Sequence, residues 1–202
     1  AKADHQWLWR LTVLSGACLG LQMGVGQIRA AHASLLLTVM QLWYCLGLRP
    51  PWWPFPLLPP LALYFAVALA LPVLRRGLAR PALGRLSKRS VLICLAMLLV
   101  SVAGLTAWFL WADPSFNRLR AQLPGNVLML WGAGLGFALV TALTEELMYR
   151  QVLMTGLEAA LGPGAWALVM QGALFGAAHF IGVPTGPVGA LLAGAYGVMQ
   201  GY

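Results

Sequence analysis

The chain contains long runs without a single Asp, Glu, Lys or Arg, and these runs constrain its fold more than any other feature. A helix needs about 20 apolar residues to cross the roughly 30 Å of hydrocarbon in a bilayer. Runs that approach or exceed this length cover residues 11–28, 30–48, 50–74, 90–112 and 127–144, and two further apolar stretches cover 165–181 and 187–202. Only 9% of the residues are charged, whereas 60% are hydrophobic, which is unlike a soluble domain. The sequence therefore predicts an all-α, polytopic transmembrane helix bundle with seven spans.

Basic residues are concentrated in one segment between the third and fourth runs. The segment contains no acidic residue, and its cations are Arg75, Arg76, Arg80, Arg85, Lys88 and Arg89. Such an excess of Lys and Arg between two spans is typical of a cytoplasmic loop. We therefore expect a multi-pass protein of the cell (inner) membrane. The net charge of +8 does not indicate nucleic-acid binding, because the segment lacks the aromatic and polar residues that read bases.

Residues 1–126 show no pattern of a catalytic site, and we interpret them as anchoring helices beside a catalytic part at 127–202, within a single membrane domain. His5 and His32 have no acidic or histidine neighbour at ligand spacing, so we expect them in terminal or loop positions. The proline-rich stretch at 50–56 predicts a rigid interfacial loop, because proline breaks helices. The cysteines lack zinc or disulfide spacing, and we interpret them as small buried hydrophobic residues: Cys18, Cys45 and Cys94.

Two adjacent carboxylates and an arginine follow the fifth run, in a setting where charges are costly and are read as functional. Glu146 and Arg150 are four residues apart, so on a helix they share a face and can form a charge-assisted hydrogen bond. Glu145 is rotated by about 100° from Glu146 on an α-helix. It is left to face a cavity, where burial would make it a stronger base. The alternative is a helix that ends here, with all three charges in the headgroup layer.

One ionisable side chain, His179, stands out in the apolar stretch that follows. The Gly-Pro-Gly sequence at 162–164 predicts a chain reversal. If both arms of the reversal are antiparallel helices, Glu145 and His179 reach a similar depth, and Phe175 packs one turn below the His179 ring. A lone histidine on an apolar helix is more often structural, but one level with a buried carboxylate is a candidate for catalysis.

Glycines four residues apart recur in this half of the chain. The pairs are Gly132 with Gly136, Gly172 with Gly176, and Gly197 with Gly201. Such pairs allow neighbouring helices to approach closely in a membrane. A nucleotide-binding loop at 132–136 is not favoured, because these glycines follow no predicted strand.

The two polar clusters together resemble a known family. Glu145-Glu146-Leu-Met-Tyr-Arg150, followed by Phe175-Gly-Ala-Ala-His179, is similar to the EExxxR and FxxxH motifs of the CPBP family of intramembrane glutamic proteases. That family includes type II CAAX prenyl endopeptidases, bacteriocin-processing proteins and Abi-like proteins, and the resemblance covers residues 134–202. It implies that Glu145 and His179 activate a water molecule for attack on a peptide carbonyl, with Glu146 and Arg150 as the supporting pair.

The third motif of the family, HxxxN or similar, has no counterpart after His179 in this sequence. The family is thought to use it to stabilise the oxyanion, and loss of such donors costs about 3 kcal/mol or more of transition-state stabilisation. We therefore expect an eighth span that carries this motif beyond Tyr202. By the same reasoning, we expect residues 1–202 alone to be inactive.

The predicted function is hydrolysis of a peptide bond in a membrane-associated or exported substrate, such as a prenylated CAAX tail, a bacteriocin leader or a C-terminal sorting signal. The expected partners are this substrate and the lipid bilayer. The alternative is a non-catalytic membrane protein, an immunity or scaffold component, in which the Glu, Arg and His side chains form a structural network. We expect no cofactor and no bound zinc, because catalytic zinc usually needs three protein ligands and no second histidine lies near His179.

The basic segment also predicts which way the site faces. If that segment is cytoplasmic, the reversal at 162–164 is cytoplasmic too, and Glu145 and His179 lie about 24 Å of helix away at about 1.5 Å per residue. The site is then nearer the outer leaflet, which favours exported leaders and sorting signals over cytosolic CAAX tails. This prediction assumes an unbroken helix over 127–161 and no re-entrant segment over 113–126.

Overall fold

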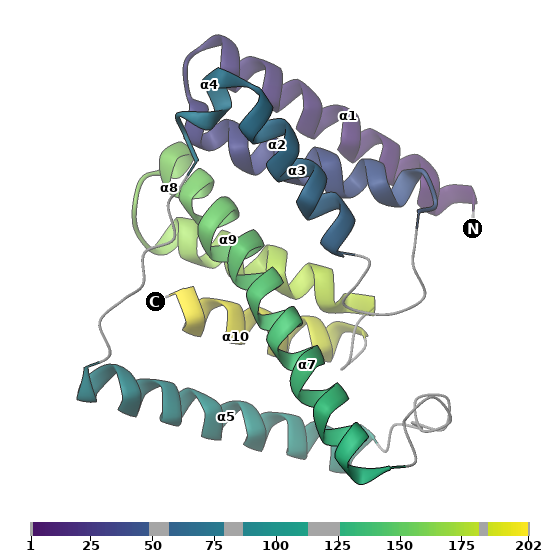
Figure 1. Ribbon diagram of the computed structural model, residues 1–202, viewed down its shortest axis with the longest axis vertical. Helices are drawn as coiled ribbons and strands as arrows, with labels where there is room; N and C mark the ends of the chain where they lie inside the picture. The colour runs from purple at the N-terminus through teal and green to yellow at the C-terminus, as the bar shows by residue number, and fades with distance from the viewer. Residues whose placement is uncertain (1, 49–56, 79–86, 113–125, 182–185, 202) are drawn as a thin grey trace. The chain divides into compact units, whose positions relative to one another are not determined.

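The computed structural model describes residues 2–48, 57–78, 87–112, 126–181 and 186–201. These residues form helices joined by turns, without a strand among them, as the all-α prediction requires. The helices are α1 (Lys2–Gly24), α2 (Ile28–Cys45), α3 (Leu58–Ala70), α4 (Pro72–Arg75), α5 (Lys88–Ala112), α7 (Val127–Glu145), the π-helix η2 (Glu146–Met154), α8 (Thr155–Leu161), α9 (Ala165–Ala178), the 3₁₀ turn η3 (His179–Ile181) and α10 (Gly186–Gly201) (Figure 1).

Two helices in the described part of the chain are long and apolar enough to cross a membrane. They are Lys88–Ala112, which is α5, and the 35-residue rod Val127–Leu161, which comprises α7, η2 and α8. The helices α3 and α9 are apolar but shorter. Every run that predicted a span contains a helix, but the number of seven spans stays a prediction. The assumption of an unbroken helix over 127–161 is confirmed, with a change of helical type inside it.

Polar side chains define where the long helices begin and end. The Asn126 side-chain oxygen accepts a hydrogen bond from the backbone N–H of Leu128 at 2.9 Å and so caps α7. Ser87 caps α5 in the same way through the N–H of Ser90 at 3.0 Å. At the other end of the rod, Gly162 has a φ of +84°. This left-handed conformation favours glycine and ends α8 at the predicted reversal.

The described residues fall into two compact units, each built from two separate stretches of sequence. The first unit comprises residues 1–81 and 136–167, and the second comprises 82–135 and 168–202. Both units therefore include residues from either side of position 126. The predicted division into an anchoring part and a catalytic part stays a functional prediction.

The first unit is built around α2. In Figure 1, α1 lies alongside α2, and α3 and α4 pack against α2 as well. The rod also contacts α2 through η2 and α8. The core consists of buried apolar side chains from α2, from α3 and the residue before it, from α4 and from η2: Ala31, Leu35, Leu36, Val39, Leu57, Leu61, Tyr64, Ala68, Leu74, Met148 and Val152. Burial of Met148 and Val152 fixes which face of η2 points toward α2 and α3.

Gly156 sets the separation between α8 and α2. A Cβ atom added to this glycine would lie 2.5 Å from the Cβ of Ala33 and 3.2 Å from the backbone oxygen of Arg29. Only a residue without a side chain allows the two backbones to approach so closely. This contact anchors the rod directly after its π-helical segment.

The second unit packs α10 against α5 and α9. Gly104 of α5 faces Leu192 of α10, and glycines from α9 and α10 meet where these helices touch. A Cβ atom on Gly172 would collide with Val198, and one on Gly176 would collide with the backbone oxygen of Ala190. The pair Gly172 with Gly176 therefore acts as predicted.

The other two glycine pairs have different outcomes. Gly197 packs against Phe175 and Gly172, and Gly201 packs against Leu168, so this pair also lies at a close contact. The prediction for Gly132 with Gly136 is wrong, since a Cβ atom on either would meet no described atom within 4 Å. These two glycines lie on an open face of α7.

Some predicted features lie outside the described residues. They are the proline-rich loop at 50–56 and the central part of the basic segment with Arg80 and Arg85. Of the remaining basic residues, Arg75 ends α4, Arg76 follows it, and Lys88 and Arg89 begin α5.

The cysteines are free thiols, but the prediction that they are buried is wrong. Cys18 and Cys45 are half-buried, and Cys94 is exposed on α5. Cys94 is exposed because α5 buries none of its side chains.

Candidate active site

The carboxylate cluster lies where the rod changes from an α-helix to a π-helix. The α-helix α7 ends at Glu145, and the nine-residue π-helix η2 begins at Glu146 and contains Arg150. A π-helix bonds residue i to i+5, which makes it wider than an α-helix, and such segments often occur at functional sites. The rotation of about 100° between Glu145 and Glu146 and the length of about 24 Å from the reversal to Glu145 hold for an α-helix, so both are overestimates for this rod.

The ion pair predicted from the four-residue spacing is present. The Nη1 atom of Arg150 lies 3.3 Å from the Oε1 atom of Glu146. The two partners differ in exposure, since the Arg150 side chain is 14% exposed and that of Glu146 is 53% exposed. The pair therefore holds the end of a mostly buried guanidinium group, and the carboxylate of Glu146 is the more accessible partner.

Glu145 is half-buried at the junction itself. The preceding residue, Thr144, is 2% exposed, and its hydroxyl donates to the backbone oxygen of Val140 at 2.7 Å. Three residues further on, Met148 is in the core of the first unit. Packing on both sides thus restricts the orientation of the Glu145 backbone, which leaves the side chain at the boundary of the core.

His179 begins the 3₁₀ turn η3, immediately after α9. Its Nδ1 atom lies 2.8 Å from the backbone oxygen of Phe175, and because a carbonyl can only accept, Nδ1 carries the proton. In the neutral ring, Nε2 is then the nitrogen with the lone pair. This is the tautomer that accepts a hydrogen bond from a water molecule or a substrate.

Phe175 packs against the His179 ring, as predicted. The two ring centroids are 4.4 Å apart with an interplanar angle of 37°. Phe175 is 2% exposed, and its other neighbour is Tyr196 of α10, with ring centroids 6.4 Å apart. The imidazole is thus supported by a side chain that is fixed in the core of the second unit.

The structure brings the predicted site residues together in two groups. Glu146 and Arg150 form one pair in the first unit, and Phe175 and His179 form another in the second unit. Glu145 belongs to the first unit and His179 to the second, so their meeting at one water molecule stays a prediction.

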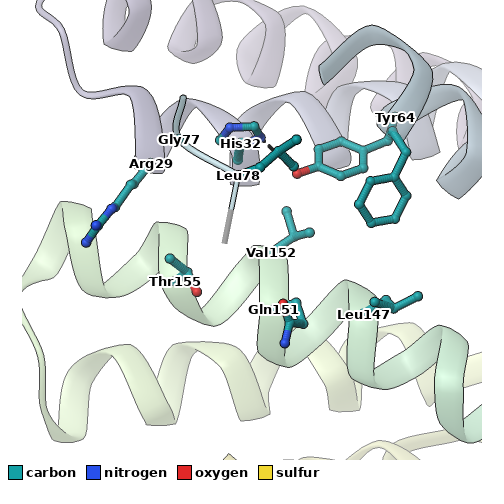
Figure 2. A pocket seen from close by; sticks show the side chains of 10 residues that line it. Arg29, His32, Tyr64, Gly77, Leu78, Leu147, Gln151, Val152 and Thr155 are labelled. Carbon is teal, nitrogen blue, oxygen red and sulfur yellow. Dashed lines mark hydrogen bonds between the residues drawn. The ribbon is translucent and has the colours of Figure 1, made fainter. Parts of the chain in front are cut away.

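His32 is a buried polar side chain in the middle of the first unit. It lies on α2, is 3% exposed and is not in a loop, so the prediction of a loop position is wrong. Its Nε2 atom donates to the backbone oxygen of Leu74 at 2.8 Å, and its Nδ1 atom accepts from the Tyr64 hydroxyl at 2.8 Å (Figure 2). The available signal was its position inside the uncharged run 30–48, where a polar residue needs a partner. His5 lies within α1 near its start.

Among the residues that the structure describes, no three His, Cys, Asp or Glu side chains come together as a metal site requires. A reaction without zinc or another cofactor stays a prediction.

Comparison with known proteins identifies the part of the chain that carries both motifs. Residues 125–202 match the family model described as "Type II CAAX prenyl endopeptidase Rce1-like". Searches of the curated proteins and of the solved structures gave no match. The matched family is a protease family, and the matched segment of this chain lies on apolar helices, as in a membrane protein. This match supports the resemblance of residues 125–202 to the CPBP family, which the EExxxR and FxxxH motifs predicted.

Proposed function

We propose that the protein is an intramembrane endopeptidase that hydrolyses a peptide bond with a water molecule activated by Glu145 and His179. The match of residues 125–202 to a protease family is the observation that carries this proposal, because the matched segment contains both motifs. The chemistry needs one base, one group that orients water and a support that holds the base in place. The described side chains offer a candidate for each role.

Glu145 is the general base of the proposed reaction. Its carboxylate takes a proton from water while the water oxygen bonds to the carbonyl carbon of the substrate. The resulting tetrahedral intermediate collapses with cleavage of the C–N bond, and Glu145 returns the proton to the leaving amine. General base and acid catalysis of this kind contributes about 10²- to 10⁴-fold to the rate.

His179 orients the water in this scheme. Its Nδ1 proton is held by the Phe175 carbonyl, so the neutral ring presents Nε2 as an acceptor for one water hydrogen. The stacked Phe175 ring restricts rotation of the imidazole. Such preorganisation is favourable because the geometry needs no rearrangement at the moment of reaction.

Glu146 and Arg150 support the base through the helix that they share with it. The ion pair spans the first turn of η2, directly after Glu145. Removal of Glu146 would leave the mostly buried guanidinium of Arg150 without this partner, which is costly. Removal of Arg150 should cost less, because the remaining carboxylate of Glu146 is half-exposed.

The proposed substrate is a peptide whose cleavage site lies at the membrane, in a multi-pass protein of the cell membrane. A prenylated CAAX tail, a bacteriocin leader and a C-terminal sorting signal all fit this description, and no nucleic acid takes part. Prenylated tails are reached from the cytosol, whereas leaders and sorting signals are reached from outside. The side on which the site opens therefore separates these substrates.

The test is cleavage of membrane-anchored reporter peptides by the full-length protein in proteoliposomes. Glu145→Gln keeps the size and hydrogen bonding of the side chain but removes the base, so cleavage should fall about 10²- to 10⁴-fold. Glu158→Gln is the matched control, because it makes the same change in α8 of the same rod. The melting temperature of each variant separates catalysis from folding.

The same experiment tests the non-catalytic alternative. If the Glu, Arg and His side chains form only a structural network, the full-length protein cleaves none of the reporters, and Glu145→Gln lowers the melting temperature alone. Normal cleavage by Glu145→Gln would show that another group is the base.

A further inference from the structure

A cavity of about 60 Å³ lies inside the first unit, between α2, α3, the end of α4 and the rod. A water molecule needs about 10–15 Å³ of such volume, so the cavity accepts a group several times larger than water. Figure 2 shows the residues that line it: Arg29, His32, Tyr64, Phe65, Gly77, Leu78, Leu147, Gln151, Val152 and Thr155. None of them has a role in the proposed peptidase reaction.

The polar side chains of Arg29 and Thr155 lie at one end of this cavity. Arg29 extends from the start of α2 toward the helix that carries Thr155, as Figure 2 shows, whereas Gln151 lies one turn before Thr155, nearer the middle of the cavity. Within the described part of the chain, these three side chains make no hydrogen bond or ion pair to another residue. Arg29 is exposed and no Asp or Glu is among the lining residues, so no carboxylate of the lining neutralises its positive charge.

The other end of the cavity is apolar. Leu147 lies two turns before Thr155 on the rod, and Phe65 comes from α3. Val152 lies between the two ends and belongs to the core of the first unit. His32 and Tyr64 bond to each other and do not offer a charge. The cavity is therefore amphipathic along the rod, with a cation at one end and hydrocarbon at the other.

The polar end lies where the sequence places a concentration of positive charge. His32 bonds to the Leu74 carbonyl, and Gly77 lies against Ile28 and His32, so the start of α2 and the end of α4 are adjacent. Arg75 and Arg76 are exposed and directly precede Gly77. Because the basic segment is predicted to be cytoplasmic, this end of the cavity is expected at the cytoplasmic face of the membrane. Anionic lipids create a negative surface potential at that face.

We propose that this cavity binds the phosphate of an anionic phospholipid headgroup. The guanidinium of Arg29 pairs with the phosphate oxygens, and Thr155 donates a hydrogen bond to one of them. The lipid chain lies toward Leu147 and Phe65. The neighbouring arginines favour a headgroup with a net negative charge over a zwitterionic one, because the latter also carries a cation. Basic pockets between helices on the cytoplasmic side suit such headgroups.

The experiment measures lipid retention by the full-length protein. Native mass spectrometry of protein from mixed micelles compares phosphatidylglycerol with phosphatidylcholine, and competition arms add inorganic phosphate or a short peptide with a free C-terminal carboxylate. We expect one retained phosphatidylglycerol that neither competitor displaces. Arg29→Gln should weaken retention about tenfold, as loss of a charge-assisted hydrogen bond predicts, and Thr155→Val should weaken it by a smaller factor.

Arg89→Gln is the matched control, because it removes the same charge from the start of α5. Retention by this variant should equal that of the unchanged protein, and Arg29→Gln should keep its melting temperature in phosphatidylcholine. Equal losses in Arg29→Gln and Arg89→Gln would overturn the proposal in favour of general attraction to a basic surface. Equal retention of both lipids, or displacement by phosphate or by the peptide, would likewise exclude a headgroup site. Because the readout is lipid mass, failure of this test leaves the proposed peptidase function untouched.

Discussion

The region around His32 and the region around His179 use the same side chain in opposite ways. His32 is 3% exposed, and both ring nitrogens are bonded at 2.8 Å to groups from α3 and α4. His179 is half-buried at the end of α9, and its Nδ1 is bonded within its own helix to Phe175. The first histidine joins three helices, whereas the second is fixed by residues next to it in the sequence.

This difference indicates which histidine is suited to chemistry. A ring whose two nitrogens both bond to protein groups in the core has its tautomer and position fixed, and it has no nitrogen left for a substrate. The His179 ring is bonded through Nδ1 to the Phe175 carbonyl and stacks on the Phe175 side chain, so its tautomer and position are set within its own helix. His32 is therefore structural in this comparison, whereas His179, which lies in the segment that matches a protease family, stays the candidate for catalysis.

The largest expected effect is on catalysis at His179. His179→Ala removes the group that orients water, so cleavage by the full-length protein in proteoliposomes should fall about 10²- to 10⁴-fold. The melting temperature should change little, because Phe175 remains packed against Tyr196. Initial cleavage rates of a membrane-anchored reporter measure the effect. Retention of most of the activity would remove His179 from the mechanism.

The next effect is on stability at His32. His32→Ala leaves the Tyr64 hydroxyl and the Leu74 carbonyl buried without this partner, at a cost of about 1–3 kcal/mol each. We expect the free energy of unfolding in detergent to fall by about 2–5 kcal/mol. Cleavage per folded molecule should fall far less than in His179→Ala. A stable His32→Ala protein that has lost its activity would reverse the comparison.

A smaller effect is expected where the support of His179 packs against α10. Gly176→Ala forces α9 away from the Ala190 backbone oxygen, and overpacking of this kind costs about 1–3 kcal/mol. Cleavage should fall as well, because a shift of α9 at Gly176 also moves the adjacent Phe175, which packs against the His179 ring. Gly132→Ala is the matched control on an open face of α7, and unfolding assays should find it neutral or stabilising. Equal destabilisation by both changes would contradict the close packing of α9 on α10.

The smallest effect is expected for Tyr64→Phe. This change removes one hydroxyl and leaves Nδ1 of His32 without its donor, so the free energy of unfolding should fall by about 1–2 kcal/mol. Combined with His32→Ala, the loss should be less than the sum, because both changes break the same hydrogen bond. A double-mutant cycle measures this coupling, and strict additivity would show that the two side chains do not interact.

The sequence by itself determined the features that depend on local spacing. Uncharged runs predicted the helices, because a polar backbone in an apolar environment must satisfy its hydrogen bonds internally. The pair Glu146 with Arg150 and the pair Phe175 with His179 are each four residues apart, so the helical repeat brings them together whatever the rest of the chain does. The motifs that carry the family resemblance are built from these same local pairs.

The tertiary structure alone decided which helices meet and at which residues. His32 lies 32 residues from Tyr64 and 42 from Leu74, and the acceptor at Leu74 is a backbone carbonyl that no side-chain pattern marks. Spacing did not reveal the π-helical segment, whose residues Met148 and Val152 are buried in a core built from elements distant in sequence, directly before the contact of Gly156 with α2. Likewise, identical four-residue glycine spacing gave close packing in α9 and an open face in α7. Spacing fixes what lies on one helix, whereas contact between helices depends on shape and packing along the whole chain.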